Sequence, residues 1–186
     1  MKCAPAIAAG KVEAIIITAS GCGVQVKDYG HLLKNDPAYA VKAARVAELA
    51  RDVAEVLFAE MEPLKALLAK GRAGRTPRRI AFHAPCSLQH GQKIRGVVES
   101  LLAAAGFDLT AVRDAHLCCG SAGTYSLLQP VLAGRLRDDK LAALEAGGGE
   151  CIVSANVGCI EHLSAGAILP IRHWIEVIDE NVTKSA

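Results

Sequence analysis

Four of the seven cysteines in this 186-residue chain are spaced so that their thiols can meet at one edge of a sheet. Cys86, Cys118, Cys119 and Cys159 each come where an apolar, strand-like run ends and a loop begins. The intervals from Cys86 to Cys118 and from Cys119 to Cys159 are each long enough for a helix and a strand. Because ligands gather at the carboxyl ends of strands in open α/β sheets, we expect the four thiols to converge.

Such a group of thiols has three candidate uses. Thiolates are the usual ligands of iron–sulfur clusters, and a cluster with several iron atoms can accept the adjacent Cys118 and Cys119. Structural zinc sites usually rely on paired C-x-x-C knuckles, which the sequence lacks. Thiol redox chemistry, or cysteines that are simply inert, is the third. Gly120 would let backbone N–H groups approach the sulfur atoms of a cluster, so we count it among the cofactor-binding residues.

Other residues have weaker claims on a metal site. Cys22 lies in a Gly-Cys-Gly turn, and His162 follows the last cysteine of the group by three residues, so both are candidate additional ligands. Cys151 is expected to be a small core residue, and Cys3 to be inert. Two histidines flank the first cysteine of the group and are candidates either for hydrogen bonds to a cluster or for ordinary packing: His83 and His90.

Strands and helices alternate along the chain. Strand-like runs cover residues 13–20, 79–84, 107–112, 151–155 and 168–171. Apolar residues at helical spacing cover residues 38–60, 94–105, 132–144 and 173–179. We expect the first strand to be fully buried and residues 38–60 to form one long helix. The alternation predicts an α/β fold with parallel strands, helices on both faces of the sheet, and strand ends that converge on the cysteines.

An internal repeat indicates two related domains. A shift of 137 residues places Gly21-Cys22 on Gly158-Cys159, and the strand before the first pair on the strand before the second. We therefore predict a partial, truncated first domain at residues 1–70 and a complete second domain at residues 80–186. Residues 71–79, rich in arginine and glycine, are predicted to be a basic linker between them.

Composition bounds the class of protein. The chain is 52% hydrophobic and has a formal net charge of +2, which argues against disorder and gives no reason to expect a nucleic-acid partner. No apolar run is long enough for a transmembrane segment, and the first residues do not resemble a signal peptide. We expect a cytoplasmic protein whose thiols stay reduced.

Six strings of residues resemble one known family. The order of Cys86, the Cys-Cys-Gly triplet and Cys159 is similar to the cysteine-rich CCG domain of heterodisulfide reductase and its relatives. Longer strings resemble the iron–sulfur subunit of glycolate oxidase, also called glycolate dehydrogenase; they are residues 19–23 (ASGCG), 27–33 (KDYGHLL), 83–90 (HAPCSLQH), 118–125 (CCGSAGTY), 156–159 (NVGC) and 172–176 (RHWIE).

The resemblance implies an electron-transfer role as the C-terminal half of such a subunit. It implies a [4Fe–4S] cluster on the cysteines of the second domain, FAD on partner subunits, and electrons passing from that flavin toward a quinone as glycolate becomes glyoxylate. Other implied features are a ferredoxin-like N-terminal half, absent here, and attachment to the inner face of the cytoplasmic membrane through the complex. The chain alone is not expected to act on substrate.

One departure from the family's pattern concerns its closing C-x-x-C, because His162 stands here where the family has a cysteine. Two other functions stay open. The chain could serve a dehydrogenase of lactate or another 2-hydroxy acid, or it could be a structural zinc-binding or cluster-free interaction module.

Overall fold

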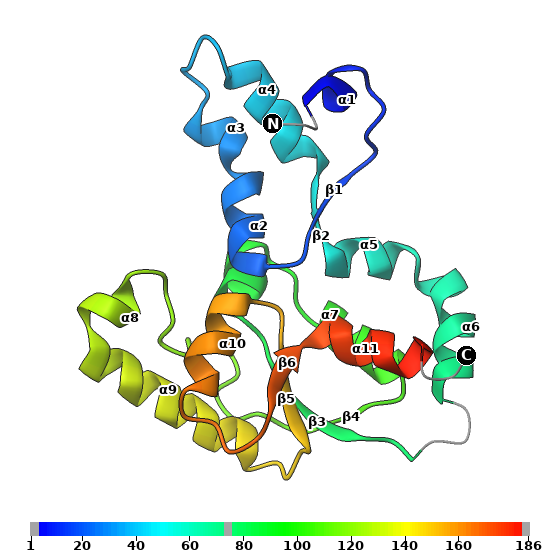
Figure 1. Cartoon of the computed structure of the whole chain (residues 1–186), viewed down its shortest axis with the longest axis vertical. Helices are drawn as coiled ribbons and strands as arrows, with labels where there is room; N and C mark the ends of the chain where they lie inside the picture. The colour runs from blue at the N-terminus through cyan, green and yellow to red at the C-terminus, as the bar shows by residue number, and fades with distance from the viewer. Residues whose placement is uncertain (1–3, 73–75, 184–186) are drawn as a thin grey trace.

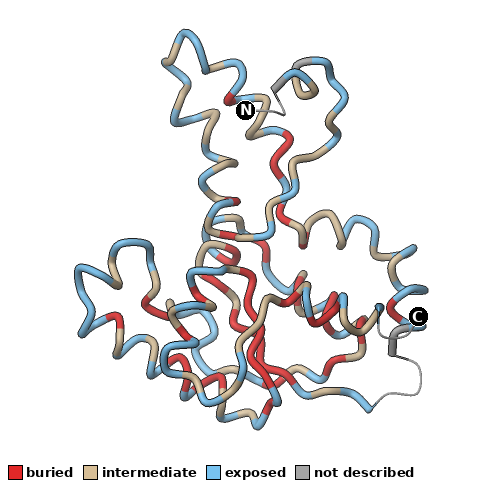
Figure 2. The backbone as a smooth tube through the Cα atoms, in the orientation of Figure 1, coloured by how far each residue is buried: buried red, intermediate tan, exposed pale blue. Residues whose placement is uncertain are grey.

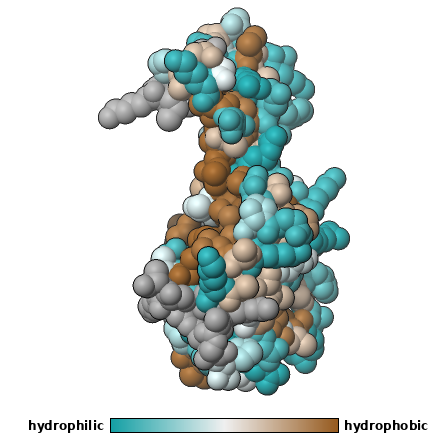
Figure 3. Space-filling view, turned by 90° about the vertical axis from the view of Figure 1, so that its right-hand side faces the viewer, coloured by the Kyte–Doolittle hydropathy of each residue, from teal (hydrophilic) through white to brown (hydrophobic). Residues whose placement is uncertain are grey.

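The computed structural model describes residues 4–72 and 76–183, which form a small lobe and a large lobe (Figure 1). Figure 3 shows the molecule narrowed between the lobes, with hydrophobic residues at the narrow part. The small lobe, residues 4–52, comprises α1 (Ala4–Ala8), β1 (Ile15–Ile17), α2 (Ser20–Lys27), α3 (Tyr29–Leu32), α4 (Ala40–Leu49) and β2 (Ala50–Asp52).

The large lobe comprises residues 53–72 and 76–183. It begins with α5 (Val53–Ala59) and α6 (Met61–Arg72), which pack against helices of the lobe. The elements that follow are β3 (Arg79–His83), the π-helical turn η1 (Ser87–Gly91), α7 (Val97–Ala104), β4 (Asp108–Leu109), α8 (Tyr125–Leu128), α9 (Pro130–Glu145), β5 (Cys151–Ser154), α10 (Val157–Ser164), β6 (Ile171–His173) and α11 (Trp174–Thr183).

A four-stranded parallel sheet forms the centre of the large lobe, with the order β4-β3-β5-β6. Successive side chains of a strand point to opposite faces. Ile80, Phe82 and Val153 therefore pack on one face with α7 and α11, whereas Ala81 and Ile152 pack on the other with α9 and α10. The predicted α/β fold, with parallel strands and helices on both faces, is confirmed.

Burial is concentrated in this sheet and its covering helices (Figure 2). The small lobe has only β1 and β2 in its sheet, paired in parallel from Ile15↔Ala50 to Ile17↔Asp52. The prediction of a fully buried first strand is wrong, because a two-stranded sheet covers little surface and leaves Ile16 53% exposed. Among the described residues, no helix combines the length and apolar composition that crossing a membrane requires.

The prediction of one long helix at residues 38–60 is also wrong. Ala50–Asp52 pairs with β1 as a strand and separates α4 from α5. Asp52 then starts α5 with a capping box, in which its side chain accepts from the N–H of Ala54 and Glu55 bonds back to the Asp52 N–H. Apolar spacing continues through all three elements, so only the pairing with a distant strand reveals the break.

Two other predicted strands are shifted or shortened. The strand expected at residues 107–112 is limited to Asp108–Leu109, where it pairs with the start of β3. The strand expected at residues 168–171 lies instead at Ile171–His173, because its pairing with β5 begins only at Ile171. The other predicted strands and helices of the large lobe lie close to where the sequence indicated them.

The 137-residue shift is visible in the elements. It carries α2, Ser20–Lys27, onto α10, Val157–Ser164, from the first residue to the last. It also carries β1 onto the last three residues of β5. The division into domains at residues 71–79 stays a prediction: α6 ends at Arg72, β3 begins at Arg79, and residues 73–75 lie outside the described part.

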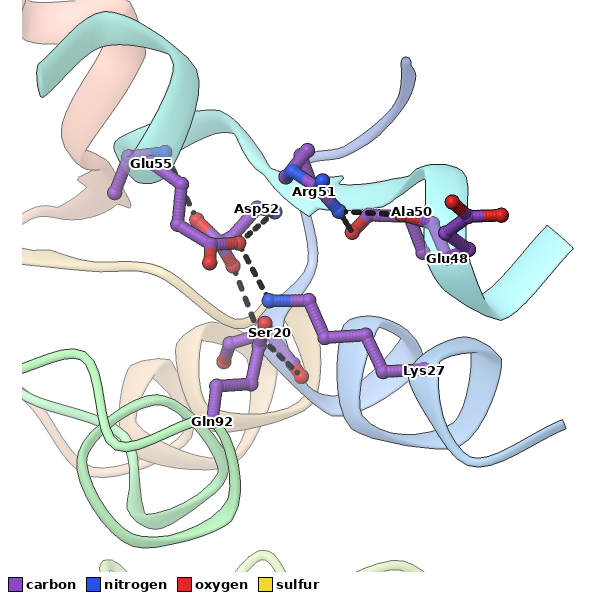
Figure 4. A network of polar contacts seen from close by, with 9 residues as sticks. Ser20, Lys27, Glu48, Ala50, Arg51, Asp52, Glu55 and Gln92 are labelled. Carbon is purple, nitrogen blue, oxygen red and sulfur yellow. Dashed lines mark hydrogen bonds and ion pairs between the residues drawn. The ribbon is translucent and has the colours of Figure 1, made fainter. Parts of the chain in front are cut away.

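Polar contacts join the lobes beside the first site cysteine. The Ser20 N–H donates to the Ala155 carbonyl at 2.9 Å, and the hydroxyls of Ser20 and Ser87 lie 2.8 Å apart. The amide Nε2 of Gln92 donates both to the Ser20 carbonyl at 3.1 Å and to Asp52 Oδ2 at 3.0 Å (Figure 4). The end of β2 and the start of α2 are therefore held against η1 of the large lobe.

Candidate metal centre

Three segments carry the cysteines to one edge of the large sheet. Cys86 follows β3 and is the N-cap residue of η1, and Cys159 lies in the first turn of α10, directly after β5. Cys118 and Cys119 lie in the long loop between β4 and α8. Because β3, β4 and β5 are parallel neighbours, all three segments start from the same edge of the sheet.

The four thiols form one continuous group. The Cys118 thiol hydrogen bonds with the thiols of both Cys86 and Cys119, and the Cys119 thiol hydrogen bonds with that of Cys159. The sulfur atoms of Cys119 and Cys159 also lie with a ring nitrogen of His83, all within 4.8 Å of one another. The structure thus brings together all four cysteines named from the sequence; their role as ligands stays a prediction.

Interactions inside the group keep most of its thiols protonated while no metal is bound. The pKa of Cys118 is held far below its usual range because the Cys119 and Cys86 thiols hydrogen bond to its thiolate. The same hydrogen bonds, together with burial, raise the pKa of Cys86 and of Cys119. Without a metal the group thus carries few of its potential negative charges. When a metal ion binds such thiols, it displaces their protons, which are released.

His83 is a further member, which the sequence indicated as a candidate either for a hydrogen bond to a cluster or for ordinary packing. It is the last residue of β3 and 2% exposed, with its Nδ1 3.0 Å from Ser154 Oγ. Its Nε2 is buried without a hydrogen-bond partner in the described residues. Burial lowers the pKa of His83 to about 4, so the imidazole is neutral near pH 7. A buried, unpaired ring nitrogen beside two thiols is what a metal centre would use.

Lys140 is a residue near the site that the sequence did not reveal. It lies in α9, is 4% exposed, and donates from Nζ to the Asp114 carbonyl at 2.7 Å. Its charge interacts with His83, Cys118 and Cys119, and its helix neighbours Leu141 and Leu144 pack in one cluster with Cys119 and Cys159. A lysine in an amphipathic helix is usually a solvent-facing residue, so no sequence signal distinguished this one.

Gly120 allows the Cys118–Cys119 loop to approach α9. Its φ is +91°, a conformation that favours glycine, and a Cβ there would lie 2.4 Å from the Ala133 carbonyl oxygen. Its N–H donates to Cys118 Sγ at 3.3 Å. The predicted approach of this N–H to the sulfur atoms of a cluster stays a prediction.

Among the described residues, none of the weaker candidates belongs to the group formed by His83, Cys119 and Cys159. Cys22 is exposed on α2, and the Nε2 of His162 is 3.3 Å from the Ala133 carbonyl oxygen. His90 contacts the His116 carbonyl from an exposed position. Cys151 is buried in the core, as expected. Cys3 lies outside the described residues.

The donor set fits an iron–sulfur cluster. Four thiols converge, two of them adjacent in the chain, and a buried N–H group already points at one sulfur. A cluster would be held by Cys86, Cys118, Cys119 and Cys159, with His83 beside them. The same donors, two cysteines with a histidine and a further cysteine, also fit zinc.

The chain is similar to one protein family and to several proteins of known name. Residues 80–164 match the family described as the cysteine-rich domain, CCG. The glycolate oxidase iron-sulfur subunit of Escherichia coli (strain K12) is 53% identical over 180 residues, which cover 97% of this chain and 42% of that protein. The probable glycolate oxidase iron-sulfur subunit of Bacillus subtilis (strain 168) is 32% identical over 156 residues, 83% of this chain and 34% of that protein.

A more distant relative is the lactate utilization protein A of Exiguobacterium sp. (strain ATCC BAA-1283 / AT1b). It is 25% identical over 183 residues, 93% of this chain and 71% of that protein. The chain thus spans less than half the length of the two glycolate oxidase subunits that it matches. Its identity to them is 53% and 32%, compared with 25% to the lactate utilization protein.

Proposed function

We propose that the chain is the cluster-binding part of an iron–sulfur subunit in a glycolate oxidase, because residues 80–164 match the family described as the cysteine-rich domain, CCG. The observation that carries the proposal is the convergence of Cys86, Cys118, Cys119 and Cys159 on one buried edge of the sheet. The 53% identity to a glycolate oxidase iron-sulfur subunit supports the choice of glycolate as the substrate of the whole complex.

The chain's own residues would bind and insulate the redox group. Four thiolates would hold a cluster, which we propose to be of the [4Fe–4S] type and which supplies one-electron transfer when bound. The Gly120 N–H would donate a hydrogen bond to a sulfur atom, and the neutral His83 imidazole would contact the sulfur atoms through its unpaired Nε2. Burial of Cys119 and Cys159 would keep water away from these two ligands.

Partners supply the remaining steps in this proposal. Oxidation of glycolate to glyoxylate releases two electrons, and a flavin, FAD, on partner subunits would accept both. The flavin would then pass them singly through iron–sulfur centres, including a ferredoxin-like region of the same subunit, toward a quinone. The complex would work in the cytoplasm at the inner face of the membrane. This chain would be part of an oxidoreductase without touching the substrate itself.

Two other functions are favoured by specific observations. The lactate utilization relatives support service to a lactate or other 2-hydroxy-acid dehydrogenase, at lower identity. The proximity of His83 to Cys119 and Cys159 supports a structural zinc site in an interaction module. Substrate-driven dye reduction with co-purified partners, comparing glycolate with lactate, separates the first alternative from the main proposal.

Metal analysis of anaerobically purified protein tests the main proposal. We expect about four iron and four acid-labile sulfide per chain, the content of one [4Fe–4S] cluster, and a paramagnetic signal after reduction or oxidation. Cys119→Ser should lose most of the iron, whereas Cys151→Ala, which changes a buried cysteine outside the group, should retain it. Zinc in place of iron, or protein that stays metal-free after anaerobic reconstitution, contradicts the cluster.

A further inference from the structure

Lys140 is the only buried lysine or arginine in residues 4–72 and 76–183 whose side chains are described. Its one hydrogen-bond partner is the carbonyl of Asp114, and no carboxylate in the described residues lies within ion-pair distance of its Nζ. Burial has the largest effect on the pKa of Lys140 and lowers it, whereas the charges of Cys119, Asp114 and Cys118 raise it. The thiol group therefore takes the place of a conventional ion-pair partner.

An ammonium in this position destabilises the fold by itself. Removing a charged group from water costs several kcal/mol unless an opposite charge compensates it. Its neighbours on α9, Leu141 and Leu144, pack in the apolar core against Cys119 and Cys159. A methionine at position 140 would suit such a place better on packing grounds alone. A buried lysine here thus points to a larger negative charge at the thiol group than the metal-free thiols supply, since of Cys86, Cys118 and Cys119 only Cys118 has a lowered pKa.

We propose that the ammonium of Lys140 is the internal countercharge of the metal centre and raises its reduction potential. This inference rests on the proposed function, because it needs a thiolate-bound cluster at the four cysteines. Thiolate ligands give such a centre a net negative charge, and each added electron increases it by one. A fixed positive charge nearby favours the more negative, reduced form. No bond is made or broken at Lys140.

A rival explanation is that Lys140 only tethers the loop. Its bond to the Asp114 carbonyl restrains the segment that leads to Cys118, and Asp114 itself has a positive φ of 51°. The two explanations differ in the metal-free protein. A tether stabilises the fold with or without metal, whereas a buried charge that the metal-free thiols compensate only in part weakens the metal-free fold. Since Asp114 is exposed, water can replace the lysine at its carbonyl.

The experiment compares Lys140→Met and Lys140→Arg with wild type, using Arg135→Met as the control that removes an exposed cation from the same helix. For each protein we would measure iron and sulfide content, the midpoint potential by redox titration, and the unfolding free energy of the metal-free form. We expect Lys140→Met to have a lower midpoint potential than wild type and a metal-free form at least as stable. Lys140→Arg and Arg135→Met should stay close to wild type in potential.

Each outcome supports or overturns the countercharge. An unchanged midpoint potential in Lys140→Met, or a metal-free form less stable than wild type with no potential shift, overturns the countercharge and supports the tether. If Lys140→Met folds but binds no cluster, full loading of Lys140→Arg supports the proposal and equal loss in Lys140→Arg overturns it. Wild type without iron and sulfide overturns the proposed function together with this inference, whereas a loaded wild type with no shift overturns the inference alone.

Discussion

The units β5–α10 and β1–α2 have the same order of strand, turn and helix, and the 137-residue shift aligns their helices from end to end. Their surroundings differ. β5 lies between β3 and β6 and is buried throughout, and Cys159 after it is buried in the thiol group. β1 pairs only with β2, and Cys22 after it is exposed.

A unit of strand, turn and helix therefore positions a cysteine but does not by itself make that cysteine a ligand. A ligand also needs neighbouring strands that deliver other donors to the same edge. In the large lobe β3 delivers His83 and Cys86, and the loop after β4 delivers Cys118 and Cys119. In the small lobe β2 delivers Asp52, which caps α5 and bonds Gln92 instead.

The equivalent cysteines test this comparison most strongly. Cys159→Ser should remove most of the bound iron, because it deletes one thiolate of the group. Cys22→Ser should keep wild-type iron and sulfide content, because its exposed side chain is no part of that group. Iron and sulfide assays on both variants provide the measurement. Loss of iron in Cys22→Ser would mean that Cys22 also helps to bind the metal, and would contradict the comparison.

The equivalent isoleucines of the two strands test packing. Ile152→Ala should lower the free energy of unfolding by about 2–5 kcal/mol, because a fully buried side chain leaves a cavity. Ile15→Ala, its partner under the shift, should cost about 1 kcal/mol, since β1 is only half-buried. Urea unfolding of the metal-free proteins measures both values. Equal losses at the two positions would show that the small lobe is packed as tightly as the large one.

Variants at the junction between the lobes are expected to have the next largest effect on the free energy of unfolding. Gln92→Ala removes the donor shared by the Ser20 carbonyl and Asp52, so we expect a loss of about 1–3 kcal/mol. Gln25→Ala, an exposed change on α2, serves as the control and should alter stability little. Thermal and urea unfolding would be compared for the two variants. A Gln92→Ala protein as stable as wild type would mean that these hydrogen bonds do not hold the lobes together.

The smallest predicted effect is a pH dependence at the same junction. Burial raises the pKa of Asp52 above its ordinary 3.8 in the folded protein. The folded state therefore binds this proton more tightly than the unfolded state, and its contribution to stability is complete below about pH 4 and lost as the pH rises through the folded-state pKa.

Asp52→Asn removes that titration while keeping a side chain that can cap α5. Relative to wild type, the variant should therefore gain stability as the pH rises from about 4 to 7, since only wild type must ionise a buried carboxyl. Unfolding free energies of the metal-free proteins across this range give the measurement. A difference between variant and wild type that stays constant with pH contradicts the expected ionisation.

Much of the candidate metal centre could be predicted from the cysteines. Their types, their spacing and the strand-like runs before them were enough to bring Cys86, Cys118, Cys119 and Cys159 together, because parallel strands separated by helices place their carboxyl ends at one edge. The glycine after Cys119 was also informative, since its residue type reports a backbone conformation.

Tertiary structure alone decided the rest. Whether Cys22 joins a site depended on which segments surround it, and whether residues 50–52 are helix or strand depended on pairing with β1. The burial of Lys140 and the unpaired nitrogen of His83 likewise arise from packing between elements distant in the chain. The physical reason is that local residue patterns determine how a segment can fold, whereas long-range contacts determine what each side chain finally meets.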